Sequence, residues 1–272
     1  MGTRLENKFA ELKRQGRKAL IIYITAGISP KGESADGPQG TVEAVRAAEA
    51  AGADIIELGL PFSDPMADGP VIQAASVRAL QGGMTLPKAL GIAREIRKFS
   101  EVPLVAMGYI NQMHHYGFEK FVQEGKAAGL DGVIVPDVPH EESAEMREVT
   151  QGQGFHLMEF ITPGTTGERM ARTCREATGF IYCVSNYGVT GVKEIDYSAI
   201  GKVCAEARKF TQVPLAIGFG IGTPEAAVQA AAQADGVIVG SAVMQRMLEG
   251  RMGEALDLIG AMRQALDKGY TR

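Results

Sequence analysis

Hydrophobic residues in this chain gather into eight short, nearly continuous runs and do not alternate with polar residues. Parallel strands that are covered by helices on both faces have this pattern. The runs end near Gly, Pro, Asn or Asp, which favour turns. We therefore expect eight buried parallel strands, within ALIIYITAG (19–27), DIIELGLP (54–61), PLVAMGYIN (103–111), DGVIVPDVP (131–139), FHLMEFITP (155–163), GFIYCVSNYG (179–188), PLAIGFGI (214–221) and DGVIVGSAV (235–243).

The segments between these runs have apolar residues at helical spacing. We expect helices within 41–52, 86–99, 118–129, 141–154, 166–178, 197–210, 224–234 and 253–266. Eight alternations of strand and helix, with no low-complexity linker, predict an α/β fold: a single (β/α)8 TIM barrel that spans residues 1–272 as one domain. An open doubly wound sheet is the alternative. Its only support is GFGIG (218–222), which lacks the GxGxxG spacing and follows the seventh strand.

Two further helices are expected outside the eight repeats. The segment 1–20 is amphipathic and lacks the apolar core of a signal peptide, so it predicts an extra N-terminal helix. The segment PVIQAASVRALQGG (70–83) follows the second strand. It has Pro70 early in its first turn and two glycines at its end, as a short extra helix would.

Composition and charge exclude several classes of protein. The chain has 272 residues, 45% of them hydrophobic, and a net charge of −4 without a basic block, so we expect no nucleic-acid partner. No stretch reaches the roughly 18 apolar residues of a membrane span, and we expect no membrane partner and a cytoplasmic location. The three cysteines are too sparse and irregular to predict a disulfide framework.

Three carboxylates lie at and beyond the end of the second strand, where a barrel places its chemistry. Glu57 falls inside the apolar run, and Asp64 and Asp68 follow in the loop. A buried acid is costly unless it is paired, which favours a functional role for Glu57; the alternative is a structural Glu bonded to the backbone or to a cation inside the barrel. For Asp68 the alternative is a residue that starts the next helix.

Glycines mark a second feature on the same rim, in GVTG (188–191), GFG (218–220) and GS (240–241). These follow the sixth, seventh and eighth predicted strands. Backbone amides at such loops and at a helix start bind phosphate well, and barrels often bind phosphate after strands seven and eight. The alternative is that the glycines only close tight turns.

Other carbon–carbon bond chemistries fit the sequence less well. A Schiff-base enzyme needs a lysine at a strand end, and none lies inside the eight runs. His114 and His115 adjoin the third run without a further ligand nearby, so they predict a polar loop pair and no metal site. No cofactor is expected.

The stretch ELGLPFSDPMADGPVIQ (57–73) resembles the signature of the tryptophan synthase alpha subunit family. YITAG, DGVIVPDVPHEES, YCVSNYGVTG, AIGFGI and VIVGSAV resemble other segments of that family in the same order, and the resemblance runs from about residue 18 to the C-terminal helix. It implies a lyase of tryptophan biosynthesis that cleaves indole-3-glycerol phosphate to indole and glyceraldehyde 3-phosphate. It also implies a beta-subunit partner in an alpha2beta2 tetramer, which takes up the indole.

The resemblance assigns roles to individual positions. Glu57 and Asp68 match the two catalytic acids, in agreement with their predicted environments: Glu57 buried with a raised pKa, and Asp68 ionised near a helix start. Asp64 matches a position that contacts the beta subunit. The positions matched to substrate binding are Tyr182, Met107, Ile161, Phe219 and Thr190, and those expected to bind phosphate are Gly191, Gly220, Gly240 and Ser241.

The chain departs from the family pattern in two loops. ISPKGESADGPQG (28–40) is longer than the short Asp-Pro turn usual in the family and lacks the Asp of that turn, and Asn186 stands where some members have Arg. Three hypotheses therefore stay open: a lyase that works in a complex, a stand-alone lyase that releases indole, and a non-catalytic activator of a beta subunit. An unrelated phosphate-binding barrel is a more distant alternative.

Overall fold

The computed structural model describes residues 2–29, 37–185 and 197–269. Eight parallel strands close into a barrel in chain order, each paired with its sequence neighbours and β1 with β8. The fold prediction is confirmed. The strands are β1 (Ala19–Thr25), β2 (Ile55–Gly59), β3 (Leu104–Met107), β4 (Gly132–Ile134), β5 (His156–Ile161), β6 (Ile181–Val184), β7 (Leu215–Gly218) and β8 (Gly236–Val239).

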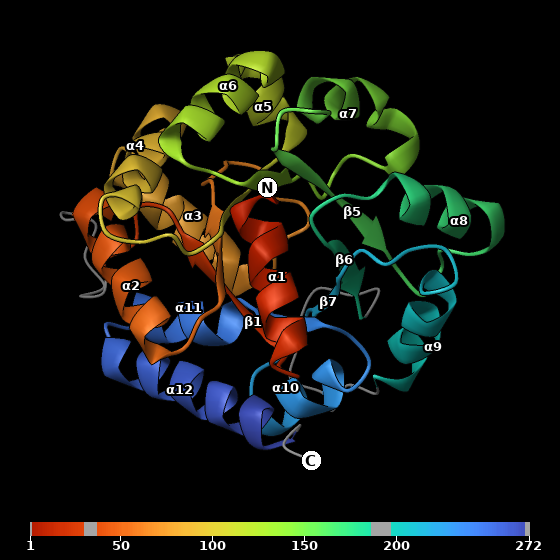
Figure 1. Ribbon diagram of the computed structural model, residues 1–272. Helices are drawn as coiled ribbons and strands as arrows, with labels where there is room; N and C mark the ends of the chain where they lie inside the picture. Colours follow the sequence, from red (N-terminus) through yellow and green to blue (C-terminus); the bar gives the residue numbers. More distant parts are fainter. Residues whose placement is uncertain (1, 30–36, 186–196, 270–272) are drawn as a thin grey trace.

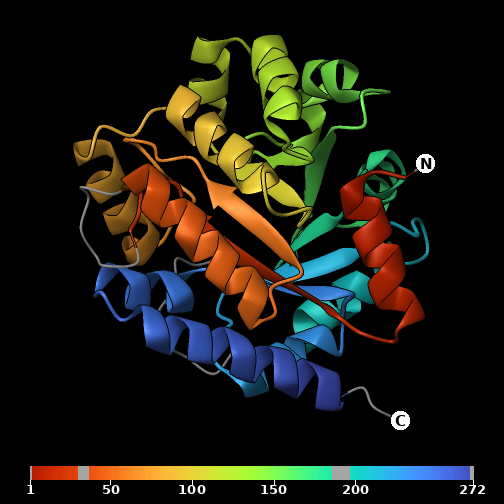
Figure 2. The ribbon, with the colours of Figure 1, turned by 60° about the vertical axis from the view of Figure 1, so that its left-hand side comes forward.

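Helices surround the barrel as an outer ring, and α1 lies across one end of it (Figure 1). The turned view in Figure 2 shows α2 and α12 running along the outside of the sheet. Strand side chains are almost all buried because they pack on neighbours at both faces. The helices are α1 (Arg4–Arg14), α2 (Gly37–Ala51), α3 (Pro70–Gln81), α4 (Leu86–Arg97), α5 (Ile110–Tyr116), α6 (Phe118–Ala128), η1 (His140–Glu142), α7 (Ala144–Thr150), α8 (Gly167–Glu176), α9 (Ser198–Ala207), α10 (Pro224–Ala231), α11 (Ser241–Leu248) and α12 (Met252–Gly269).

Both extra helices are present. α1 buries Leu5, Phe9 and Leu12, and its first turn is closed by a capping box between Thr3 and Glu6. α3 begins with Pro70 and ends at Gly82, as its sequence predicts. Among the described residues, no helix is both long and apolar enough to cross a membrane.

Three aspartates directly precede β2, β4 and β8: Asp54, Asp131 and Asp235. Each exchanges two hydrogen bonds with a leucine on the preceding strand, where the backbone N–H of the Asp donates to the Leu carbonyl and the Leu N–H donates to the carboxylate. Each carboxylate also pairs with an arginine. The sets are Asp54 with Leu20 and Arg263, Asp131 with Leu104 and Arg97, and Asp235 with Leu215 and Arg208.

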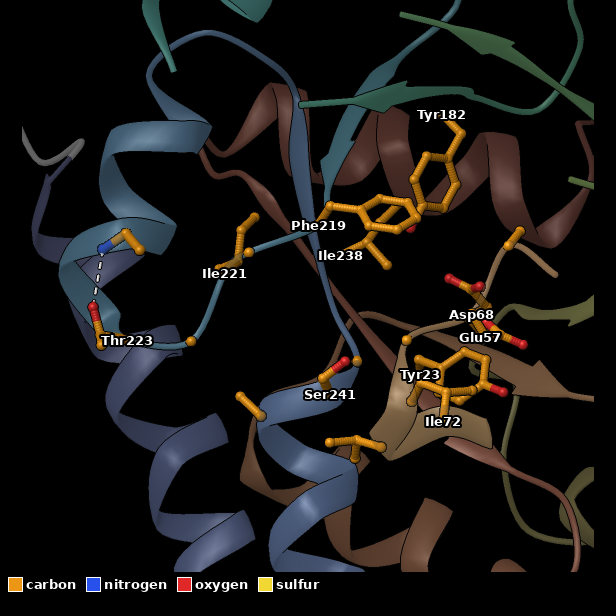
Figure 3. Close-up of a pocket in the computed structure, with 18 of the residues that line it drawn as sticks. Tyr23, Glu57, Asp68, Ile72, Tyr182, Phe219, Ile221, Thr223, Ile238 and Ser241 are labelled. Atoms are coloured by element: carbon orange, nitrogen blue, oxygen red, sulfur yellow. Dashed lines mark hydrogen bonds between the residues drawn. The ribbon is translucent and has the colours of Figure 1, made fainter. Parts of the chain in front are cut away.

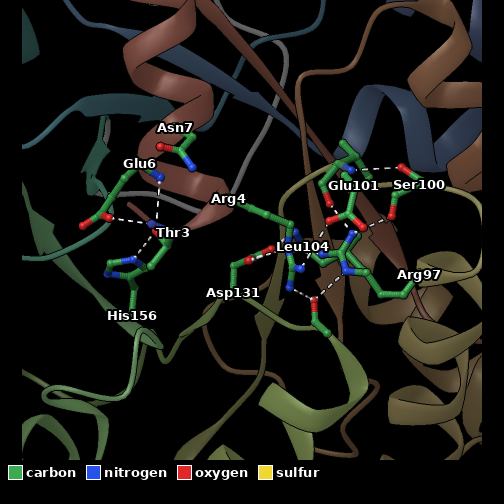
Figure 4. A network of polar contacts seen from close by, with 12 residues as sticks. Thr3, Arg4, Glu6, Asn7, Arg97, Ser100, Glu101, Leu104, Asp131 and His156 are labelled. Atoms are coloured by element: carbon green, nitrogen blue, oxygen red, sulfur yellow. Dashed lines mark hydrogen bonds and ion pairs between the residues drawn. The ribbon is translucent and has the colours of Figure 1, made fainter. Parts of the chain in front are cut away.

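The Asp131 set also fastens α1 to the barrel (Figure 4). Arg4 Nε of α1 donates to Asp131 Oδ1 at 2.9 Å, while Arg97 donates to Oδ2 at 3.0 Å. Beside them, Thr3 Oγ1 lies 2.9 Å from His156 Nε2 on β5. These contacts close the end of the barrel opposite the loop that carries Asp68, so the candidate site has one open side.

The third apolar run is shorter as a strand than its sequence suggests. β3 ends at Met107, and residues 110–116 form α5. His114 and His115 therefore lie on a helix, and the prediction that they form a polar loop pair is wrong in this respect. Asp137 explains the early helix, since its carboxylate accepts the N–H of Ile110 at 3.1 Å.

Candidate active site

A pocket of about 1250 Å³ opens at the carboxyl ends of the strands. Its inner part is formed by strand residues, and its outer part by the start of α3 and by α10 and α11. Of the predicted site residues, the pocket brings together Glu57, Asp68, Met107, Tyr182, Phe219, Gly220, Gly240 and Ser241. Residues from seven of the strands and from α3, α9, α10 and α11 thus meet around one cavity, and Figure 3 shows part of this arrangement.

Glu57 is the third residue of β2 and is 3% exposed. Its Oε2 has no hydrogen-bond partner among the described residues. Burial and the neighbouring Asp68 raise the pKa of Glu57 to about 8. The group therefore carries a proton at neutral pH, and it lines the pocket, as suits a general acid.

Asp68 lies in the loop between β2 and α3 and is also buried. It does not start the helix: Gly69 is the residue before α3, and no side chain caps that helix. The Asp68 carboxylate instead accepts a hydrogen bond of 2.9 Å from the Tyr109 hydroxyl. Burial raises the pKa of Asp68 to about 6 and the Tyr109 hydrogen bond opposes this rise, so the group is mainly ionised at neutral pH.

Aromatic side chains form one wall of the pocket. The ring of Phe160 on β5 stacks on Tyr182 of β6 with centroids 5.1 Å apart, and Phe219 meets Tyr182 edge-on at 6.2 Å. Ile161 is fully buried but does not line the pocket. Because successive strand residues point to opposite faces, Phe160 occupies the inner face of β5 and Ile161 the outer one. The structure therefore does not bring Ile161 to the site.

Two tyrosines of the pocket lie directly over glycines on the next strand. A Cβ at Gly59 would lie 2.0 Å from the Tyr23 hydroxyl, and a Cβ at Gly218 would lie 2.3 Å from the Tyr182 hydroxyl. Any side chain at either glycine would displace a ring. Tyr23 also faces the acids, since it is paired with Glu57 in the β1–β2 register and lies beside it in Figure 3.

The far side of the pocket combines a turn after β7 with the start of α11. Phe219 and Gly220 both have left-handed backbone angles, with φ of 74° and 72°, and Ser185 Oγ donates to the carbonyls of Gly218 and Phe219. Thr223 caps α10 by accepting the N–H of Ala226, as Figure 3 shows. The residue before α11 is Gly240, which has no side-chain cap, so the first N–H groups of α11 are available to a ligand.

Thr190 and Gly191 lie outside the described residues, as does Asn186. Asp64 is exposed on the loop between β2 and α3, away from the pocket lining. Three further residues of the site were not predicted from the sequence: Tyr23, Phe160 and Tyr109. A polar-tipped aromatic residue inside an otherwise aliphatic run was the available signal for Tyr23.

The closed barrel and these two carboxylates define a (β/α)8-barrel protein with an acid–base site at the mouth of the barrel. The family model described as tryptophan synthase alpha chain matches residues 9–266. A curated tryptophan synthase alpha chain from Citrifermentans bemidjiense is 42% identical over 99% of this chain and 98% of its own.

Solved structures agree with this comparison. Tryptophan synthase subunit alpha from Legionella pneumophila has a TM-score of 0.87 at 35% identity, with 98% of this chain and 100% of that chain covered. A chain of tryptophan synthase from M. tuberculosis in an aminoacrylate-bound form has a TM-score of 0.85 at 30% identity, with 97% and 100% covered.

The chain belongs to the tryptophan synthase alpha chain family. It is a lyase of tryptophan biosynthesis that catalyses the alpha reaction, the cleavage of indole-3-glycerol phosphate. The family partners with a beta subunit.

Proposed function

We propose that Glu57 and Asp68 divide the chemistry of the alpha reaction. Cleavage breaks the bond between indole C3 and the adjacent hydroxyl-bearing carbon. A proton must reach C3, the hydroxyl must lose its proton, and a positive charge develops meanwhile at the ring nitrogen. Glu57 donates the first proton, and its carboxylate then takes the hydroxyl proton. Asp68, as a carboxylate, accepts the indole N–H and stabilises the positive charge.

One observation carries this assignment: Glu57 is buried next to the ionised Asp68, with a pKa of about 8 and with no hydrogen-bond partner for its Oε2 in the described part of the chain. Two acids whose surroundings separate their pKa values are suited to different tasks in one reaction. The stacked Phe160 and Tyr182, together with Met107 and Phe219, support a flat apolar slot for the indole ring.

The substrate phosphate binds, in this proposal, at the start of α11. Gly240 leaves the first amides of that helix uncapped, whereas α10 is capped by Thr223. The helix dipole favours an anion at that end, and Gly220 and Ser241 line the same part of the pocket. Gly191 and Thr190 complete the predicted set.

The remaining parts of the proposal concern the assembly. Residues 1–272 act as one domain in the cytoplasm, in an alpha2beta2 tetramer with the beta subunit, which receives the indole. Asp64 contacts that partner, because it is exposed on the loop that also carries Asp68.

Release of indole from indole-3-glycerol phosphate, with and without the beta subunit from the same source, tests the proposal. We expect weak release by the free chain and a large increase with the partner. Glu57→Gln and Asp68→Asn should each lower the rate by at least 10²-fold without loss of the fold. Glu225→Gln is the matched control, because Glu225 is an exposed carboxylate at the pocket mouth.

The other outcomes separate the alternatives. Equal rates with and without the partner would identify a stand-alone lyase. A faster beta reaction without any indole release would identify a non-catalytic activator. If Glu57→Gln and Asp68→Asn kept the wild-type rate, the assignment of the two acids would be wrong.

A further inference from the structure

Tyr109 is buried at the start of α5, where its side chain reaches the loop between β2 and α3. Its hydroxyl is held from two sides. The N–H of Ala67 donates to the Tyr109 oxygen at 3.2 Å, and the hydroxyl donates to Asp68 Oδ2 at 2.9 Å. With one donor and one acceptor in place, the hydroxyl has a single orientation, and it fixes the direction of the carboxylate.

The same turn of α5 holds the other end of the loop. The side-chain amide of Gln112 donates to the Pro61 carbonyl at 2.7 Å, and its oxygen accepts the N–H of Tyr109 at 3.2 Å. The ring of Phe62 stacks on that of Tyr109 with centroids 5.4 Å apart. Contacts to residues 61, 62, 67 and 68 therefore all originate within one helical turn.

We propose that Tyr109 is a positioning residue for the alpha reaction, whose hydroxyl holds the Asp68 carboxylate in the orientation that accepts the indole N–H. This inference rests on the proposed role of Asp68. The hydroxyl can hold the carboxylate in this way because a hydrogen bond to a charged group is stronger than a hydrogen bond between two neutral groups. An unheld carboxylate would first have to be oriented by the substrate.

Loss of the Tyr109 hydroxyl also affects the titration of Asp68, which has several ionisable groups around it. They are Tyr109 on α5, Glu57 on β2, Tyr23 on β1 and Tyr182 on β6. Burial raises the pKa of Asp68, and the hydrogen bond from Tyr109 opposes that rise. Removal of the hydroxyl therefore favours the protonated form of Asp68 and shifts its titration to higher pH.

The test is Tyr109→Phe in the complex with the beta subunit, with kcat and KM for indole release measured across pH. The ring and its stacking on Phe62 remain, so the fold should survive, which a melting curve checks. We expect a fall in kcat/KM on the order of ten-fold, mainly in kcat, and an acid limb displaced upward by roughly one pH unit. Tyr116→Phe is the matched control, since Tyr116 lies at the other end of α5 and donates to Glu124.

An equal fall in kcat/KM at all pH values, with the acid limb unmoved, would show that Tyr109 has a merely structural role and would overturn the inference. An unchanged kcat would also overturn it. Asp68→Asn in the same assay separates this failure from that of the proposed function. If Asp68→Asn abolishes release while Tyr109→Phe behaves as wild type, only the role of Tyr109 is wrong. If Asp68→Asn is itself active, the role of Asp68 fails first. A double variant no slower than Asp68→Asn would confirm that Tyr109 acts through Asp68.

Discussion

Glu57 and Asp68 reach the same pocket with different pKa values. Burial raises both, the charge of Asp68 raises that of Glu57 further, and the hydrogen bond from Tyr109 lowers that of Asp68. The alpha reaction as proposed needs Glu57 protonated and Asp68 ionised. Below about pH 6 Asp68 gains a proton and loses its charge, and above about pH 8 Glu57 loses the proton it must donate. We therefore expect a bell-shaped dependence of kcat/KM on pH, with its maximum between these values.

Initial rates of indole release from pH 5 to 10, at limiting substrate, measure this profile. Asp68→Asn should remove the acid limb from whatever activity is left. A plateau that continues through pH 10 would show that Glu57 is not the acid.

The sequence predicts both acids but not all of their neighbours. Glu57 is conspicuous as a charge inside an apolar run, and Asp68 belongs to a recognisable motif. The error at Ile161 has a physical cause. The runs are apolar on both faces, so they carry no alternation that would distinguish the inner residue, Phe160, from the outer one. Tyr109 was missed because its partner is 41 positions away in the chain.

At the scale of elements, the aspartates before β2, β4 and β8 are repeated supports of the barrel. Asp131 accepts bonds from Leu104 N–H, Arg97 and Arg4, and its side chain is 5% exposed. Asp131→Ala would leave a buried N–H and a largely buried guanidinium without this acceptor. We expect a loss of about 3 kcal/mol of unfolding free energy, measured by urea denaturation.

Glu101→Ala is the control for this loss. Glu101 pairs with the same Arg4, but its side chain is 78% exposed. Solvent screens such a pair, so its removal should change stability by less than about 1 kcal/mol. Equal losses for the two variants would contradict the role assigned to Asp131.

Element types follow well from the sequence where a periodic segment is long, and less well at short elements. The extra helix after β2 was predicted from its Pro and Gly boundaries, and Pro70–Gln81 confirms it. α5 was not predicted. It has only seven residues, and its start depends on Asp137 from a loop that follows another strand. A contact between residues so far apart in the chain leaves no pattern in the sequence around the helix.

At the scale of the whole molecule, the loop between β2 and α3 carries the most exposed large hydrophobic side chain of the described residues. Met66 is 77% exposed, beside Asp64. Burial of such a side chain against a partner stabilises a complex by roughly 1.5–3 kcal/mol. We therefore expect Met66→Asp to weaken binding of the beta subunit at least ten-fold, as measured by calorimetry.

Ala10→Asp is the control for the added charge. Ala10 is exposed on α1, which covers the opposite end of the barrel. It should leave the affinity unchanged. An unaffected affinity in Met66→Asp would place the partner on another surface.

The barrel itself was predictable because its signal is distributed over the whole chain. Eight apolar runs alternate with amphipathic segments, and an error in one predicted boundary does not change the number of predicted strands. The pocket was less predictable from the sequence, because it depends on which side chains point inward from strands that are far apart in the chain.

The tyrosines that rest on Gly59 and Gly218 constrain how this pocket can evolve. Each glycine tolerates a larger residue only after the tyrosine above it has become smaller, so the order of the two substitutions decides whether the intermediate protein is functional. The reverse order forces a ring into the substrate space. In a lineage that acquires a different substrate, a substitution of Gly59 or Gly218 therefore has to follow one at Tyr23 or Tyr182.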